Sequence, residues 1–425
     1  MKSILKYTLP AFAIAGLLSS CEPELDAPGA SAGNANFSKY NAYGNSLTAG
    51  YGNGGIYRES QLNSFPSILA QQFKLAGGGD FKQPLFSEAQ KNGTGYVKLT
   101  GFTNAGSPIL TPVTTELAYR GGTTLGGDPL LTKYLEPINN YGVPGLSVFA
   151  STMPTYSGLN NHFERITAAA GTVSYLEMVS ASDPTFFTFW LGNIDVLGYA
   201  TSGGVPSNAF QAITDTAIFR DRYNKLIDAA TIKNAKGVLA TIPDVTAIPF
   251  FTTVTVPRVS AAAGGAKVYI RTGLNDTREA TPDDLILLST QTGIGDTTGG
   301  VPPHGFHPAN PLTNKEVLDK DEVKMVRDAT MAFNETIRRT GLRKDLPVAD
   351  MNGFLTTLNQ GPLFSYGVAN TSSYITGNVF ALDGVHLTPR GNAFVANEFI
   401  RVINTKYGSN IPQVNPNNYE GIRLP

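Results

Sequence analysis

The sequence is short of cysteine and of charge, and both shortages exclude classes of protein. Its single cysteine, Cys21, leaves the chain without an internal disulfide, so a large apolar core must supply the stability. Charged residues make up only 15% of the chain and the formal net charge is −1, which provides no basic surface for nucleic acid. After the N-terminus, no stretch is long and apolar enough for a membrane-spanning helix. We therefore expect neither a nucleic-acid partner nor a membrane-spanning domain.

The N-terminus has the pattern of a secretory signal. Lys2 and Lys6 precede an apolar run over residues 7–18, which is too short to span a bilayer comfortably. The run ends in Leu18-Ser19-Ser20-Cys21, which resembles a bacterial lipobox, in which the cysteine is acylated and becomes the first mature residue. We predict a signal peptide over residues 1–20, lipidation at Cys21, and a place in the cell envelope as an outer membrane lipoprotein, facing the periplasm or the cell surface. An ordinary secretory signal with an incidental cysteine is the alternative.

The rest of the chain has the composition of a tethered globular domain. Residues 21–36 are acidic and then rich in small residues, so we expect a flexible tether there and a single domain over residues 37–425. The chain has 45 glycines and 27 prolines, which favour long ordered loops. Two stretches without a clear period, residues 76–137 and 249–311, are predicted to be loop insertions into the domain.

Short apolar runs alternate with helical patterns along the domain. The runs predict buried strands at residues 37–43, 186–191, 237–242 and 346–351. The spacing of apolar residues predicts helices at residues 65–73, 160–179, 215–234, 321–339 and 388–406. This alternation is typical of a parallel sheet with helices on both sides. The predicted fold class is therefore α/β, a three-layer α/β/α sandwich with a mainly parallel central sheet.

Two polar segments near the ends of the domain have the residue types of a nucleophilic site. Gly44 permits a tight turn after the first strand, which exposes the Ser46 hydroxyl and places its N–H at a helix N-terminus. Asp383 and His386 are three residues apart, so one turn can place the carboxylate against the imidazole while the other ring nitrogen faces a serine. Each segment alone also fits a structural role, as a helix cap or an ordinary turn.

Four segments in this order resemble the sequence blocks of the SGNH (GDSL-type) hydrolases: Gly44-Asn45-Ser46-Leu47, Asn140-Tyr141-Gly142-Val143-Pro144-Gly145, Gly192-Asn193-Ile194-Asp195 and Asp383-Gly384-Val385-His386. The resemblance spans most of residues 37–405 and implies the flavodoxin-like form of the α/β/α fold. It implies that Ser46 is the nucleophile, His386 the general base and Asp383 its partner. The implied oxyanion hole uses the N–H groups of Ser46 and Gly145 and an asparagine amide.

Two positions depart from that family's pattern. Asn45 stands where the family usually has aspartate, and asparagine keeps one oxygen acceptor for local hydrogen bonds. Ile194 stands where the oxyanion asparagine belongs, and Asn193 comes one residue earlier. Asn193 is therefore the candidate for the third donor of the oxyanion hole, provided that the loop after the strand shifts by one residue.

A pair of histidines elsewhere in the chain is a candidate metal site. His304 and His307 lie in a proline- and glycine-rich stretch, and a metal would need further ligands from other segments. The composition of the stretch favours an exposed loop instead, so we expect no metal and no cofactor.

The sequence thus predicts an exported, lipid-anchored serine esterase or acylhydrolase. We expect an ester substrate, an acylated glycan or lipid, and a monomer held at the membrane by its N-terminal lipid. The alternative, motivated by Ile194, is a non-catalytic surface lipoprotein that uses the same fold to bind glycan or lipid.

Overall fold

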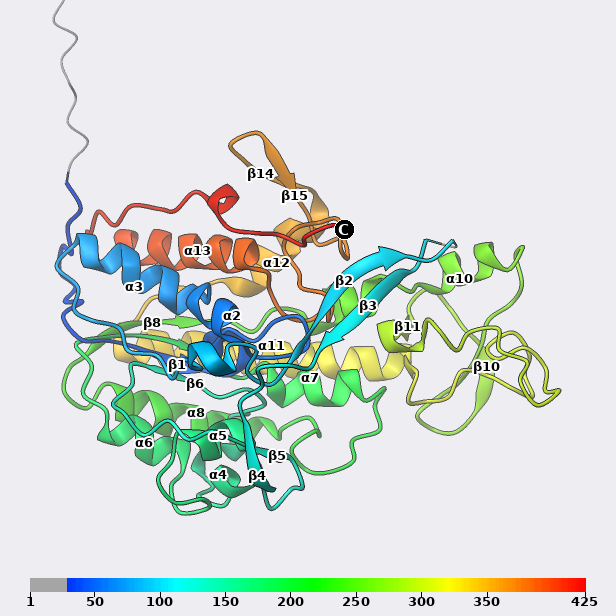
Figure 1. Ribbon diagram of the computed structural model, residues 1–425, viewed down its shortest axis with the longest axis horizontal. Coiled ribbons are helices and arrows are strands. Elements are labelled where there is room, and N and C mark those ends of the chain that lie inside the picture. Colours follow the sequence, from blue (N-terminus) through cyan, green and yellow to red (C-terminus); the bar gives the residue numbers. More distant parts are fainter. Residues whose placement is uncertain (1–28, 105) are drawn as a thin grey trace, which may run out of the picture.

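The centre of the computed structural model, which describes residues 29–104 and 106–425, is a parallel sheet of five strands (Figure 1). The strands are β1 (Tyr40–Gly44), β6 (Asn140–Gly142), β7 (Phe186–Trp190), β8 (Lys236–Ala240) and β13 (Val348–Ala349). Their order in the sheet is β13-β8-β7-β1-β6, and every neighbouring pair is parallel. This order is that of flavodoxin-like doubly wound folds. The second strand lies on one side of the first strand, and the later strands are added on its other side. The predicted fold class is confirmed.

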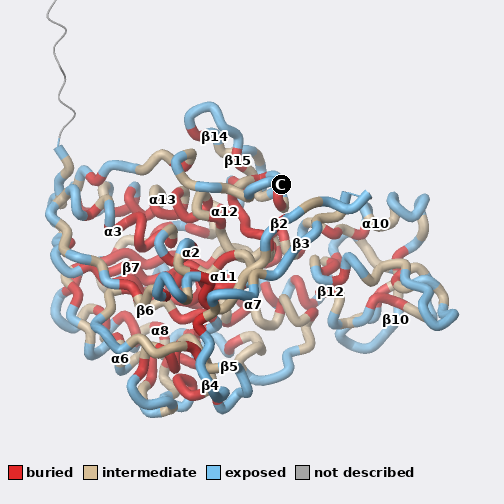
Figure 2. Tube along the Cα trace, viewed as in Figure 1, coloured by how far each residue is buried: buried red, intermediate tan, exposed pale blue. Residues whose placement is uncertain are grey.

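Helices cover both faces of the sheet and make it a three-layer sandwich (Figure 1). On one face lie α3 (Phe65–Leu75) and α13 (Pro389–Tyr407), and on the other lie α6 (Tyr175–Ala181), α8 (Thr216–Ala230) and α11 (Lys320–Lys344). Side chains of β7 alternate between the layers, because Phe186 and Trp190 join the cluster under α3 and α13 while Phe189 joins the other. Figure 2 shows the sheet as the buried centre of the molecule.

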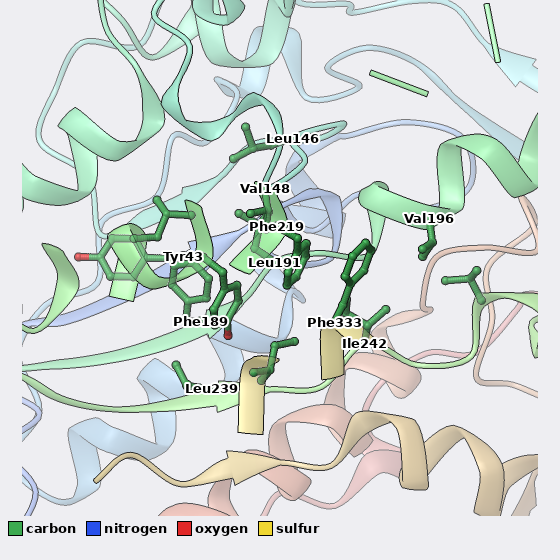
Figure 3. Packing of buried hydrophobic residues seen from close by; sticks show 14 of the residues in the cluster. Tyr43, Leu146, Val148, Phe189, Leu191, Val196, Phe219, Leu239, Ile242 and Phe333 are labelled. Carbon is green, nitrogen blue, oxygen red and sulfur yellow. The ribbon is translucent and has the colours of Figure 1, made fainter. Parts of the chain in front are cut away.

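Aromatic stacking holds the second layer against the sheet. Phe219 of α8 and Phe333 of α11 are fully buried and stack with their ring centroids 4.0 Å apart. Figure 3 shows both rings beside Phe189 and Leu191, which lie at the end of β7. The end of this strand, where the third sequence block begins, is therefore held by a densely packed core.

The two predicted insertions contain regular structure. The first forms two antiparallel hairpins, β2 (Tyr96–Phe102) with β3 (Pro108–Val113) and β4 (Tyr119–Thr123) with β5 (Pro129–Leu131). The second forms α9 (Pro249–Thr252), α10 (Val256–Ala262), β9 (Tyr269–Arg271) with β10 (Thr277–Glu279), and β11 (Leu285–Ile286), which pairs with β12 (Val317–Leu318) just beyond the insertion. It has an apolar cluster of its own and extends to one side in Figure 1. The hairpins give no periodic signal because strands such as β4 are exposed at every residue.

Three further expectations were wrong in part. The helix predicted at residues 160–179 is two helices, α5 (Asn161–Arg165) and α6, because Gly171 has φ +73° and Ser174 caps α6 with Glu177. The strand predicted at residues 346–351 is short, and α12 (Met351–Gln360) follows it at once, ahead of the hairpin of β14 (Leu363–Ser365) and β15 (Val368–Asn370).

The third expectation that was wrong in part is the flexible tether at residues 21–36. Residues 1–28, including Cys21 and the predicted signal peptide, lie outside the described residues. The Ser31 N–H donates to the Asn410 carbonyl (3.2 Å) and the Asn34 N–H to the Tyr407 carbonyl (2.8 Å), so this part of the chain lies against the end of α13. In the described part of the chain, no helix combines the length and the apolar content needed to cross a bilayer.

Candidate active site

The turn after β1 places Ser46 at the carboxyl edge of the sheet, where its side chain is buried. The short helix α1 (Ser46–Ala49) begins directly after Asn45, whose side-chain oxygen accepts a hydrogen bond from the Leu47 N–H (3.2 Å). Gly44 allows this tight geometry, since a Cβ atom there would lie 2.1 Å from the Thr48 hydroxyl and 2.5 Å from the Trp190 carbonyl oxygen. The site therefore lies between β1 and β7, at the topological switch point where ligands bind in such folds.

The structure brings Ser46, His386 and Asp383 together in one hydrogen-bonded chain. His386 Nε2 lies 2.9 Å from Ser46 Oγ, and His386 Nδ1 lies 3.1 Å from Asp383 Oδ2. The other carboxylate oxygen of Asp383 accepts from the N–H groups of Val385 (2.9 Å) and His386 (2.8 Å), so the turn itself orients the pair. All three side chains are mostly buried, which strengthens these contacts.

Asp383 is held as a carboxylate by its surroundings. Burial alone would raise its pKa, but the adjacent His386 and the hydrogen bonds from His386 and from the Gly54 N–H (2.9 Å) hold the pKa of Asp383 well below its usual range. A negative charge next to Nδ1 favours the tautomer that leaves Nε2 free to accept a proton from Ser46.

The loop after α1 supports this pair and was not anticipated from the sequence. The Tyr51 ring packs against the His386 ring, with centroids 4.6 Å apart, and its hydroxyl donates to the Gly54 carbonyl (2.8 Å). The Asn53 side-chain oxygen accepts from the Leu382 N–H (3.0 Å). Burial, followed by the Asp383 and Tyr119 charges, raises the pKa of Tyr51 to about 12, so the ring is a neutral phenol. These residues give no periodic signal in the sequence, because they act through single contacts to a segment more than three hundred residues away.

Of the residues predicted to form the oxyanion hole, Asn193 lines the cavity at Ser46 and Gly145 does not. Asn193 occupies the N-cap position of α7 (Ile194–Thr201), where its side chain makes no capping hydrogen bond. It lines the same cavity as Ser46 and His386, and its buried Oδ1 has no partner among the described residues. Gly145 has φ +79° and does not line this cavity, but its loop adjoins the serine turn through the Val143 N–H, which donates to the Gly44 carbonyl (3.1 Å). Ile194 also lines the cavity, and its side chain offers no hydrogen bond there.

Asp195 links the second and third sequence blocks. It is fully buried and accepts hydrogen bonds from the N–H groups of Val148 (2.7 Å) and Phe149 (3.0 Å) and from the Thr214 hydroxyl (2.7 Å). Burial raises the pKa of Asp195 to about 6, against the effect of these hydrogen bonds. The carboxylate thereby ties the loop that follows Gly145 to the first turn of α7. The sequence placed Asp195 in a block but indicated no role for it.

The two histidines considered as metal ligands have other partners. His304 lies between Asn310 (3.2 Å) and the Glu316 carboxylate (3.1 Å), and His307 Nδ1 accepts from the Ala309 N–H. Across residues 29–104 and 106–425, no group of three or more histidine, cysteine, aspartate or glutamate side chains could hold a metal ion.

Serine hydrolases have a serine hydroxyl that is hydrogen-bonded to an imidazole, which in turn is hydrogen-bonded to a carboxylate. The chain matches the family model of the GDSL-like lipases/acylhydrolases over residues 40–399, and it belongs to that family. It is therefore an ester-bond hydrolase.

Similar solved structures include enzymes of this kind. A mutant acetyl-xylooligosaccharide esterase from Geobacillus stearothermophilus is 11% identical with a TM-score of 0.35, over 87% of this chain and 95% of that chain. A lipase/acylhydrolase from Enterococcus faecalis is 12% identical with a TM-score of 0.34, over 88% and 98%. An extracellular lipase from Streptomyces rimosus is 9% identical with a TM-score of 0.32, over 86% and 98%. No curated protein matches this sequence.

We predict a pH-dependent contribution of Asp195 to stability. Its pKa in the folded chain is about 6 rather than 3.8, so between these values the folded chain binds more protons than the unfolded chain. Its contribution to the free energy of unfolding therefore falls as the pH rises through this window, by on the order of 2–3 kcal/mol. Urea unfolding from pH 4 to 7 measures the free energy of unfolding of wild type and of Asp195→Asn. The value for wild type minus the value for the variant should fall as the pH rises. A difference that is constant, or that grows with pH, contradicts this prediction.

Proposed function

We propose that the protein is an exported, lipid-anchored serine esterase that hydrolyses carboxylic esters through an acyl-enzyme. The observation that carries the proposal is the chain of contacts from Ser46 Oγ through the His386 ring to Asp383. A weak nucleophile such as serine needs an adjacent base, and a base needs a third group to orient it. The contacts of Ser46, His386 and Asp383 support such an arrangement.

The reaction follows from these contacts. His386 Nε2 takes the proton of Ser46 Oγ as the oxygen attacks the ester carbonyl carbon, and Asp383 stabilises the imidazolium that forms. The tetrahedral intermediate breaks the bond to the alcohol, which receives the proton from His386 and leaves. Water, deprotonated by the same imidazole, then attacks the acyl-enzyme, and the acid is released as Ser46 regains its proton.

Three donors are proposed for the oxyanion: the Ser46 N–H, the Gly145 N–H and the Asn193 side-chain amide. The Ser46 N–H lies at the start of α1, where backbone N–H groups favour negative charge. Asn193 is supported by its place in the cavity wall with Ser46 and His386. Asp195 holds the loop that follows Gly145 against the first turn of α7, which follows Asn193.

A non-catalytic lipoprotein that binds glycan or lipid is the competing function, favoured by Ile194 in the third block. The distances at Ser46 and His386 speak against it, because a binding protein does not need an imidazole at 2.9 Å from a serine hydroxyl. A measurement of ester hydrolysis distinguishes the esterase from the binding protein directly.

Replacing Ser46 or His386 should abolish ester hydrolysis without unfolding the domain. Ser46→Ala and His386→Ala are each expected to lower kcat by on the order of 10⁶-fold, because the two residues act as a unit. Hydrolysis of p-nitrophenyl esters measures the loss, and circular dichroism checks the fold. His307→Ala, in the loop of the second insertion, is the matched control and should keep full activity. Equal turnover by His386→Ala and wild type would remove the histidine from the mechanism.

We further propose that the enzyme is anchored in the cell envelope through diacylglycerol on Cys21, where acylated glycans or lipids are the available substrates. Two or three acyl chains give stable membrane binding without a membrane-spanning helix. The proposal rests on the sequence of residues 2–21, which lie outside the described part of the chain.

The anchor is tested by Cys21→Ala in cells labelled with radioactive palmitate. The variant should lose the label and move from the membrane to the soluble fraction, because its only thiol is gone. Ser20→Ala keeps a small residue before the cysteine and should remain labelled. Palmitate on the Cys21→Ala protein would contradict lipidation at this residue.

A further inference from the structure

The cavity at Ser46 is almost entirely apolar. Of its 20 lining residues, only Asn45, Ser46, Asn193 and His386 are polar, while the rest are aliphatic, aromatic, methionine or proline residues. Glycan hydroxyls have no place in such a wall, because each would lose hydrogen bonds to water without replacement. A hydrocarbon chain gains free energy from the same surface.

Two helices supply much of the apolar wall. Met351, Phe354, Leu355 and Leu358 recur at helical spacing and turn one face of α12 into the cavity, while its Thr356 and Thr357 are exposed. From α7, Ile194 and Leu197 are three residues apart and line the same cavity as Asn193. The isoleucine that departs from the family's pattern thus extends the apolar surface directly beside the reacting centre.

We propose that this cavity binds the acyl chain of the ester, and that the enzyme prefers acyl groups longer than acetyl; this rests on the proposed esterase function. The cavity has a volume of about 70 Å³. A water-sized group takes up about 30 Å³ in a condensed phase, and a methylene group is of similar size, so about two to three such groups fit. The methyl group of acetyl leaves most of this space unfilled.

The test is the chain-length dependence of kcat/KM on p-nitrophenyl esters from acetyl to dodecanoyl. Each methylene that enters the cavity should raise kcat/KM about fourfold, so hexanoate esters should exceed acetate esters by about tenfold or more. The rise should end at the chain length that fills the cavity. A rate that is highest for acetyl and falls with each added carbon overturns the proposal while leaving the esterase function intact.

Two substitutions narrow the cavity or change its polarity. Leu355→Trp fills it, and Ile194→Asn places an amide in its wall, so both should lower the ratio of kcat/KM for hexanoyl to that for acetyl esters by about tenfold or more. Leu342→Trp is the matched control, since Leu342 is 83% exposed on α11, and it should leave the ratio unchanged. An unchanged ratio in both cavity variants, with the fold retained, overturns the assignment.

Binding of the product acid separates the two proposals. Calorimetry on Ser46→Ala should show hexanoate binding more tightly than acetate, with the difference lost in the double variant that also has Leu355→Trp. If no ester is hydrolysed by wild type but hexanoate is still preferred, the esterase function fails and the acyl cavity stands. If hexanoate and acetate bind equally, the acyl cavity fails whatever the hydrolytic activity.

Discussion

The hydrogen bond between Ser46 and His386 joins two turns that are 340 residues apart in the chain, and the arrangement of the site depends on it. The layer on one face of the sheet keeps the two turns together. Helix α3 follows the serine turn and α13 follows the histidine turn, and they pack through Phe65 and Phe399, whose rings stack 5.1 Å apart. Because both helices are also buried on the same strands, neither turn can move without disrupting the core.

The segment between α1 and α2 (Arg58–Leu62) helps to position His386 and Asp383 relative to Ser46. It starts from the nucleophile's own helix, and through Tyr51, Asn53 and Gly54 it contacts the ring of His386, the backbone at Leu382 and the carboxylate of Asp383. The base and its partner are therefore positioned by the same part of the chain that presents the serine. Such preorganisation reduces the reorganisation that the reaction requires.

The sequence predicted those parts whose signal is local. The run Phe186–Trp190 indicated a buried strand, and the spacing of Asp383 and His386 indicated a turn that pairs them. The helix α12 has apolar residues at helical spacing and could have been found, but the predicted strand was extended over its first residue. The contacts of Tyr51 and Asn53 depend on how distant segments meet, and no local pattern encodes that.

Activation of Ser46 by His386, despite Ile194 in the third block, can be measured without knowing the substrate. The experiment is mass spectrometry of the folded mature domain after incubation with a fluorophosphonate, because this probe requires an activated serine. We expect a single adduct on Ser46 that is absent in His386→Ala. A folded protein that forms no adduct, or forms it equally without the histidine, would show that His386 does not activate Ser46.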